Sequence, residues 1–254
     1  DQLALWQQQA LLSNQKLPLI LHVDTGMNRL GFEWQEFALL REQKEMLACF
    51  DLLFGMSHLA CAEDVDSGYS EQQLRRCKLL QTFFPSFCLA NSTGIFLGTR
   101  YHFNYVRPGC ALYGLNPLPK HENPMQQVVT LHVPILHIRT IGELNAIGYH
   151  HSYMAKGGDK IAILPIGYAD GYLRVLSNKA HVMVQGMLAP IVGKISMDLM
   201  MVDVSHLPEK LAHPGAMIEI IGKHCTIDML AKQAGTINYE ILVRLGNRFS
   251  RHYY

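Results

Sequence analysis

The sequence has little charge and none of the long apolar runs that mark a membrane protein. Charged residues are 17% of the 254 residues, and the net charge is +1. This balance favours neither nucleic acid nor an acidic membrane as a partner. Apolar runs such as residues 17–21 are too short to span a bilayer, and no signal peptide is visible. The hydrophobic content of 49% instead indicates a globular protein with a sizeable core.

Metal-binding and disulfide patterns are also missing. The cysteines form no C-x-x-C pair and do not combine with histidines at a zinc-like spacing. His150 and His151 are the only adjacent histidines and a weak metal candidate, so we expect no metal. We expect small buried thiols in a reducing cytoplasm at all six cysteines: Cys49, Cys61, Cys77, Cys88, Cys110 and Cys225.

The first half of the chain alternates predicted helices and strands. An amphipathic helix comes first, with one stripe formed by Leu3, Trp6, Ala10 and Leu11. Strands are predicted at 19–23 (buried on both faces), 52–54, 87–90 and 105–106, with helices along Trp34, Phe37 and Leu40 and over 71–82. Four such repeats predict a parallel sheet with right-handed crossovers. A full (β/α)8 barrel needs about 250 residues, so we expect the C-terminal half of one.

The pattern changes at a proline-marked linker formed by Pro117, Pro119 and Pro124. We therefore predict two domains, a partial cofactor-binding barrel over 1–122 and a mainly-β domain over 123–254. Strands are predicted at 128–141, 160–166, 181–184, 200–204 and 217–221. Two short helices follow, one ending before Gly235 and one near Tyr239 with Asn238 as its N-cap.

Polar residues follow each predicted strand of the first half, where barrels carry their functional groups. They are His22 to Arg29, Ser57-His58, Asn91-Ser92 and Arg107 to Cys110. Ser92 and the amides around Gly109 and Cys110 could cradle a phosphate while the arginines approach a planar ring. Taken singly, each has an ordinary explanation, since an arginine after a strand is usually a surface ion-pair partner and a lone His58 a satisfied core histidine.

Five motifs occur together and in order. They are Asp24-Thr-Gly-Met-Asn-Arg29-Leu-Gly, Asn91-Ser92, Arg107-Pro-Gly-Cys-Ala-Leu-Tyr-Gly, Pro165-Ile-Gly-Tyr168-Ala-Asp-Gly-Tyr-Leu-Arg174 and Gly193-Lys-Ile-Ser-Met197-Asp198. From about His22 to Arg248 the chain resembles bacterial alanine racemase, a pyridoxal-phosphate enzyme with an N-terminal barrel and a C-terminal β domain. The resemblance implies interconversion of L- and D-alanine by two-base proton transfer, in the cytoplasm, supplying D-alanine for peptidoglycan.

The resemblance also implies a role for each matching residue. Arg107 would face the pyridine nitrogen of the cofactor and leave it unprotonated, because a guanidinium does not readily give up a proton. Arg29 would bond the phenolic oxygen. Tyr149 would be a catalytic base, supported by His58 hydrogen-bonded onward to Arg107. The phosphate would be held by Ser92, Gly109, Cys110 and Tyr239.

Substrate contacts are implied for Arg29, Met197 and Asp198, with Tyr168 and Arg174 lining the access route. In the resembled family Tyr149 and Met197 enter the site of the opposite subunit, so a homodimer is expected. Structural alternatives stay open for these residues. Tyr149 and Tyr153 could be packing residues of the β domain, Met197 could be core, and residues 167–171 a plain turn.

The chain departs from the resembled family at two places. His22 stands where a carbamylated lysine often braces the arginine, so we expect Arg29 to be positioned otherwise and activity to be altered. No lysine matches the one that carries the cofactor. Lys16 precedes a strand, Lys194 matches another family position, and Lys44 and Lys78 lie on predicted helices. We therefore expect a fragment that is inactive alone.

Two alternatives belong to other classes. The chain could be a non-catalytic assembly piece that docks with a separately supplied front half. It could also be a related pyridoxal-phosphate decarboxylase, but that reading predicts an active-site cysteine motif in the β domain, where Cys225 is the only cysteine.

Overall fold

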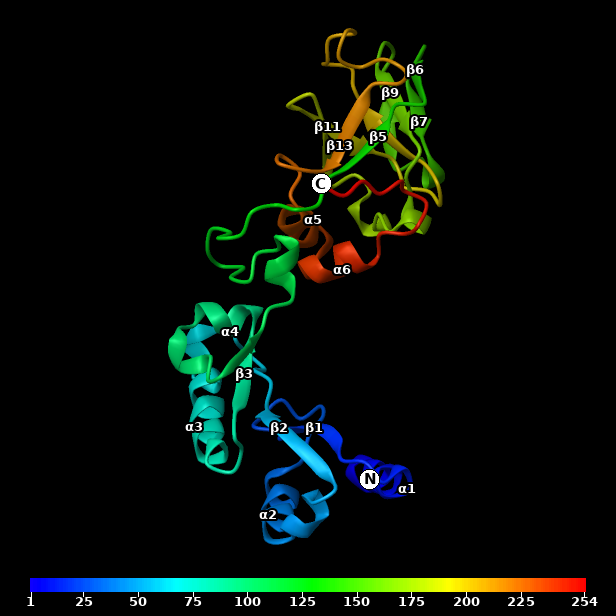
Figure 1. The fold of residues 1–254 in the computed structure, drawn as a ribbon. Helices are drawn as coiled ribbons and strands as arrows, with labels where there is room; N and C mark the ends of the chain where they lie inside the picture. Colours follow the sequence, from blue (N-terminus) through cyan, green and yellow to red (C-terminus); the bar gives the residue numbers. More distant parts are fainter. The chain divides into compact units, whose positions relative to one another are not determined.

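The computed structural model describes residues 1–43 and 45–254, and the chain divides into two compact units. The first unit comprises Asp1–Leu112 and Pro117–Asn123. The second comprises Tyr113–Asn116 and Pro124–Tyr254. Each unit has its own sheet, as the ribbon in Figure 1 shows.

The first unit is built on a parallel sheet of four strands in the order β1-β2-β3-β4. The strands are β1 (Leu17–His22), β2 (Phe50–Met56), β3 (Phe87–Asn91) and β4 (Tyr105–Arg107). The helices are α1 (Gln2–Ser13), α2 (Trp34–Glu42), α3 (Tyr69–Gln81) and α4 (Ser92–Phe96). Since parallel strands need crossovers, helical segments separate successive strands, and all four carboxyl ends lie at one edge of the sheet. The predicted α/β class is confirmed.

Burial in this unit is greatest along β3. The β3 residues Phe87, Leu89 and Ala90 are fully buried, whereas Ile20 of β1 is 44% exposed. The prediction that the first strand is buried on both faces was therefore wrong. Among the described residues β1 pairs only with β2, so fewer side chains cover it.

The apolar stripe predicted on α1 is only half buried. Leu3 and Ala10 are buried, but Trp6 and Leu11 are 58% and 68% exposed. On α2, Phe37 and Leu40 are buried while Trp34 is 45% exposed. Spacing predicts which residues share a helix face, but the extent of cover depends on the neighbouring elements.

The second unit is built on a seven-stranded antiparallel sheet in the order β5-β13-β10-β11-β12-β9-β6. A separate pair, β7 (Asn145–Ile147) and β8 (Tyr153–Ala155), hydrogen-bonds to no third strand among the described residues. The helices are α5 (Ile227–Ala234) and α6 (Asn238–Val243). The sheet strands are β5 (Leu131–Pro134), β6 (His137–Thr140), β9 (Lys160–Leu164), β10 (His181–Val184), β11 (Met187–Val192), β12 (Met200–Asp203) and β13 (Met217–Ile221). The predicted mainly-β class is confirmed.

Several details of this unit differ from the sequence prediction, which also missed β7 and β8. The stretch predicted as one strand over 128–141 is two strands, β5 and β6, which lie at opposite ends of the sheet order. Strand β11 was missed because Pro190 lacks an N–H and argues against an inner strand. The N-cap of α6 is Ile237, while Asn238 is its first helical residue and donates from Nδ2 to Asp228 and to the carbonyl of Asn116.

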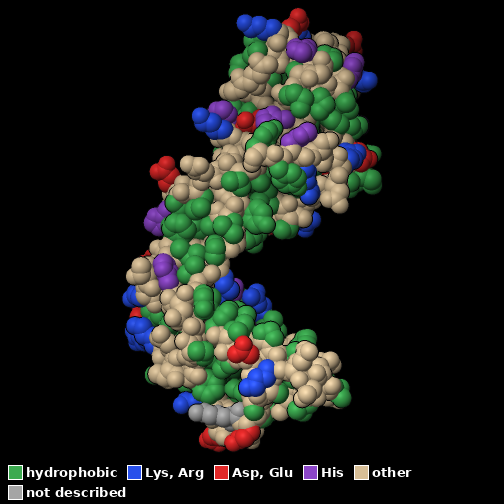
Figure 2. All heavy atoms as spheres, viewed as in Figure 1, with side chains coloured by type: hydrophobic (Ala, Val, Ile, Leu, Met, Phe, Trp, Pro, Cys, Tyr) green, Lys and Arg blue, Asp and Glu red, His purple; other side chains and the backbone are tan. Residues whose placement is uncertain are grey.

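No helix in the described part of the chain combines the length and the apolar character needed to cross a membrane. Figure 2 shows hydrophobic side chains interspersed with polar atoms on the face in view. Helix α1 carries exposed apolar side chains at Leu5, Leu11 and Leu12, which are 66%, 68% and 75% exposed.

Candidate functional site

Arg107, at the end of β4, is anchored to the ends of two other strands. Its Nη2 donates to the carbonyl oxygens of Ser57 (2.8 Å) and Leu89 (3.3 Å). Its Nη1 donates to Sγ of Cys88 at 2.8 Å. The guanidinium is thus held in place across the carboxyl end of the sheet. The sequence predicts Cys88 only as a buried thiol and misses this contact, because no pattern in the sequence distinguishes it from the other five cysteines.

His58 lies beside this guanidinium, with 3.3 Å between Arg107 Nη2 and His58 Nδ1. Because arginine can only donate, Nδ1 must accept, and the ring carries its hydrogen on Nε2. Burial lowers the pKa of His58, and the nearby charges of Arg107 and Arg29 lower it further. His58 is therefore a neutral imidazole at pH 7 with an N–H that Arg107 does not use.

A buried polar network holds the backbone around His58. Gln73 of α3 donates from Nε2 to the carbonyl of His58 (2.8 Å) and to Thr25 Oγ1 (3.1 Å). Its Oε1 accepts from the amide of Ala60 at 2.8 Å. Thr25 in turn contacts Ser57 Oγ at 2.7 Å. Thr25, Ser57 and Gln73 are each at most 2% exposed. Gln73 was also missed, since a glutamine within a polar helix gives no signal that it faces inward.

Ser92 brings two segments together at the end of β3. Its buried hydroxyl accepts hydrogen bonds from the backbone amides of Gly109 (2.7 Å) and Ala111 (3.3 Å). Asn91 caps the following helix, α4, by accepting from the amide of Gly94 at 2.9 Å. The structure therefore places Ser92, Gly109 and Cys110 together, as the sequence predicted. The amide of Ala111 was not among the predicted groups.

The loop after β1 is shaped by Asp24. Its carboxylate accepts from the amides of Gly26 (2.8 Å), Met27 (2.8 Å) and Asn28 (2.6 Å). Burial raises the pKa of Asp24, but these three hydrogen bonds outweigh it and hold the pKa below its usual value. Asp24 is therefore a structural residue of the predicted motif, because it holds the loop that leads to Arg29.

Arg29 is exposed and makes no hydrogen bond or ion pair with any other residue in the described part of the chain. His22, half-buried at the end of β1, does not brace it. Burial lowers the pKa of His22, and the charges of Arg107 and Arg29 add to that effect against the opposing charge of Asp24.

The other predicted site residues belong to the second unit and are largely exposed. Tyr149 is 65% exposed, Met197 53%, Tyr168 43% and Tyr239 42%. Arg174 and Asp198 are exposed as well. Tyr149 opens a tight turn in which His150 and His151 both have positive φ, at 59° and 49°. By contrast, the Tyr153 hydroxyl contacts Asp203 Oδ2 at 3.3 Å, and burial with the Asp203 charge raises its pKa.

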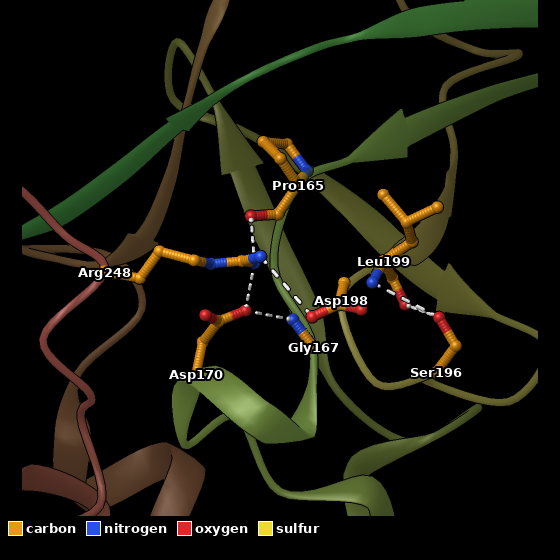
Figure 3. A network of polar contacts seen from close by, with 7 residues as sticks. All are labelled: Pro165, Gly167, Asp170, Ser196, Asp198, Leu199 and Arg248. Carbon is orange, nitrogen blue, oxygen red and sulfur yellow. Dashed lines mark hydrogen bonds and ion pairs between the residues drawn. The ribbon is translucent and has the colours of Figure 1, made fainter.

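Met197 and Asp198 lie on a loop that packs against the turn at residues 167–171 (Figure 3). The amides of Tyr168 and Ala169 donate to the carbonyls of Ser196 (3.1 Å) and Met197 (3.0 Å). Arg248 contacts Asp198 and Asp170, a link that the sequence prediction missed. The two motifs that carry the predicted substrate residues are thus joined in space.

The lysines and cysteines need separate mention. Lys16 is exposed before β1, Lys78 is exposed on α3 and Lys194 is half-buried, while Lys44 lies outside the described residues. The six cysteines are free thiols, four of them buried. The described residues contain no group of three or more His, Cys, Asp or Glu side chains arranged to hold a metal ion.

Comparison with known proteins gives a consistent result for both units. Residues 1–117 match the family model "Alanine racemase, N-terminal domain", and residues 128–253 match "Alanine racemase, C-terminal domain". The chain is 46% identical to the alanine racemases of Rickettsia canadensis and Rickettsia bellii. These alignments cover 99% and 100% of this chain but 70% and 62% of the two relatives.

A solved structure supports the same assignment. The alanine racemase of Bartonella henselae, solved with covalently bound pyridoxal phosphate, superposes with a TM-score of 0.92 at 38% identity. The match covers 99% of this chain and 70% of that one. Fold, ordered motifs and sequence identity agree, and the chain belongs to the alanine racemase family.

Proposed function

We propose that the protein carrying this chain is an alanine racemase (EC 5.1.1.1) that interconverts L- and D-alanine with pyridoxal phosphate. The observation that carries the proposal is the contact of Arg107 with His58 at the strand ends, because it sets an invariably charged group beside a neutral proton donor. Following the family, D-alanine would serve peptidoglycan synthesis in the cytoplasm. The chain spans 62 to 70% of its Rickettsia relatives, so the activity is proposed for the protein that contains it.

The strand-end residues fit a phosphorylated, planar cofactor. Ser92 accepts from two amides and keeps its own O–H to donate, which suits a phosphate oxygen. Pyridoxal phosphate, when bound, supplies a ring that makes the α-hydrogen of an amino acid acidic. We assign Arg107 to the pyridine nitrogen and Arg29 to the phenolic oxygen. The phosphate would be held by Ser92, Gly109, Cys110 and Tyr239.

Tyr149 is our candidate for one of the two bases. A phenol is a weak base at neutral pH unless a neighbour stabilises its charged form. His58 can do so by donating its Nε2–H, because Arg107 occupies Nδ1. We propose that Tyr149 reaches this cluster from a second subunit of a homodimer. Its 65% exposure leaves the hydroxyl available for that contact.

We further propose that Arg29, Met197 and Asp198 contact the substrate, and that Tyr168 and Arg174 line the access route. Met197 would act in the opposite subunit, and its 53% exposure is compatible with that role. We also propose the domain boundary at 122/123, with the cofactor held mainly by the first domain.

The test is production of D-alanine from L-alanine by the purified 254-residue chain with added pyridoxal phosphate, followed by chiral chromatography. The same assay is run after adding the N-terminal segment of the Rickettsia canadensis relative that precedes the aligned region. Activity that requires this segment would identify the chain as a docking part of the enzyme. Absence of D-alanine in both assays, and in the same assay of the protein that contains this chain, would contradict the proposal.

Tyr149→Phe supplies the residue-level test. Loss of a catalytic base should slow racemisation by about 10²- to 10⁴-fold. Tyr153→Phe is the matched control, since its hydroxyl contacts Asp203 rather than facing solvent, and it should retain most activity. Equal rates in the two variants would remove Tyr149 from the mechanism.

A further inference from the structure

A buried carboxylate joins two segments of the second unit. Asp170 is only 2% exposed. Its Oδ2 accepts from Arg248 Nη2 at 2.6 Å and from the amide of Gly167 at 2.9 Å (Figure 3). A carboxylate is expensive to bury unless it is paired and hydrogen-bonded. The position of the 167–171 turn therefore depends on the C-terminal segment that carries Arg248.

Arg248 reaches beyond Asp170. Its Nη1 lies 3.4 Å from Asp198 Oδ1, and its Nη2 lies 3.4 Å from the carbonyl oxygen of Pro165 (Figure 3). One guanidinium thus contacts the residue that follows β9, the 167–171 turn and the loop that carries Asp198. Arginine suits this position because its planar group presents several donors in fixed directions.

The turn and the loop are also in close backbone contact. A Cβ added at Gly167 would lie 2.2 Å from the carbonyl oxygen of Met197, so no larger residue fits without moving the loop. Within the loop, Ser196 Oγ donates to the carbonyl of Leu199 (2.7 Å) and accepts from its amide (3.2 Å). Met197 and Asp198 therefore project from a closed loop whose backbone rests on the turn.

We propose that Asp170 and Arg248 are positioning residues that set the place of the 196–199 loop, and through it the direction of Met197 and Asp198 toward substrate. The part concerning substrate rests on the proposed function. Asp198 and Arg248 have side chains that are 55% and 51% exposed, and an exposed ion pair of this kind is weak by itself. The buried end of the network, Asp170, supplies the anchor that the exposed pair lacks.

Hydrogen exchange of the 254-residue chain, read by mass spectrometry, tests the proposal without requiring activity. Arg248→Gln removes the ion pairs of residue 248 with Asp170 and Asp198. The backbone amides of Tyr168, Ala169 and Leu199 should then exchange at least about tenfold faster. Arg248→Lys, which keeps a charge but cannot span both carboxylates, should fall between Arg248→Gln and the unaltered chain. Arg251→Gln, an exposed arginine three residues later, is the matched control and should leave these amides unchanged.

The pattern of exchange decides the outcome. Faster exchange confined to residues 165–170 and 196–199 supports a positioning role. Unchanged amide exchange in Arg248→Gln overturns the positioning role. A uniform increase in exchange over the whole second unit also overturns it, because Asp170 and Arg248 would then stabilise the whole unit. Asp170→Asn gives a second reading, since it keeps the side-chain shape, removes the charge and should affect the same two segments.

A kinetic measurement separates this proposal from the proposed function. In the active protein, Arg248→Gln should raise KM for alanine at least about fivefold while kcat changes less, because the loop is displaced but the proton-transfer groups are intact. A decrease in kcat larger than the increase in KM would overturn the positioning role toward substrate. If the unaltered protein makes no D-alanine, the proposed function fails while the exchange experiment still tests the link between Asp170, Arg248 and the loop.

Discussion

Arg107 and His58 show how a single residue can set the chemistry of its neighbour. The guanidinium donates to Nδ1, so protonation of His58 would place two positive charges against each other in a half-buried position. The lowered pKa of His58 follows from burial first and from Arg107 second. The lowered pKa of His58 is thus a property of the folded state and is lost on unfolding.

This difference predicts how stability changes with pH. In the unfolded chain His58 titrates at its ordinary value of 6.5, and in the folded chain it titrates lower. As pH falls below 6.5, His58 takes up a proton in the unfolded state before it does so in the folded state. The free energy of unfolding should therefore fall by up to about 1.4 kcal/mol per pH unit, until the pH reaches the pKa of His58 in the folded chain. Above 6.5 this residue should contribute no pH dependence.

Urea unfolding read by tryptophan fluorescence measures the effect, because both tryptophans, Trp6 and Trp34, lie in the first unit. His58→Asn can still accept from Arg107 but does not titrate, so it should flatten the dependence below pH 6.5. His22, whose pKa is also lowered, should leave a residual slope. The exposed His252 is the control, and an equal flattening in His252→Asn would show that the slope has another source.

Helix α3 shows how an element supports the site without contacting a ligand. Its Leu74, Cys77 and Leu80 are buried in the core, and this face also carries Gln73 inward to the His58 backbone. Packing of α3 against the core therefore fixes the position of the His58 backbone.

Replacing Gln73 by leucine should destabilise the first unit by about 3 kcal/mol, because three buried or half-buried polar partners lose their hydrogen bonds. Those partners are Thr25, the carbonyl of His58 and the amide of Ala60. The midpoint of urea unfolding, read by tryptophan fluorescence, reports the change. Gln72→Leu, an exposed neighbour on the same helix, should stay within about 0.5 kcal/mol of the unaltered chain. If the two variants were equally stable, the network would carry no net stability.

Elements were easier to predict than the contacts between them. Residues such as Phe87, Leu89 and Ala90 form an apolar run that predicts a buried strand directly, and Gly235 marks the end of α5 because it adopts φ of 70°. Strand β11 was missed because Pro190 within it has no N–H to donate, which argues against an inner strand. The polar residues at the strand ends gave Arg107, His58 and Ser92 as candidates. Cys88, Gln73 and Arg248 act through long-range contacts, which local spacing does not encode.

On the scale of the whole chain, the division into two units does not follow the chain order strictly. Tyr113–Asn116 belongs to the second unit, although Pro117–Asn123 returns to the first. In the second unit Asn238 Nδ2 donates to the carbonyl of Asn116 at 3.2 Å, and a Cβ at Gly114 would lie 2.3 Å from the carbonyl of Gln126. Leu115, between them, is 2% exposed.

These contacts predict that a fragment of residues 113–254 will be more stable than one of residues 124–254. The shorter fragment follows the proposed boundary closely but lacks Leu115 and the acceptor of Asn238, and loss of a buried leucine side chain alone typically costs about 2 to 5 kcal/mol. Because both tryptophans lie outside these fragments, unfolding is followed by circular dichroism of the antiparallel sheet. Leu115→Ala in the longer fragment isolates the packing contribution and should fall between the two. If the two fragments had the same free energy of unfolding, residues 113–123 would act only as a connection. The boundary at 122/123 would then describe the folding units better than the division seen in the structure.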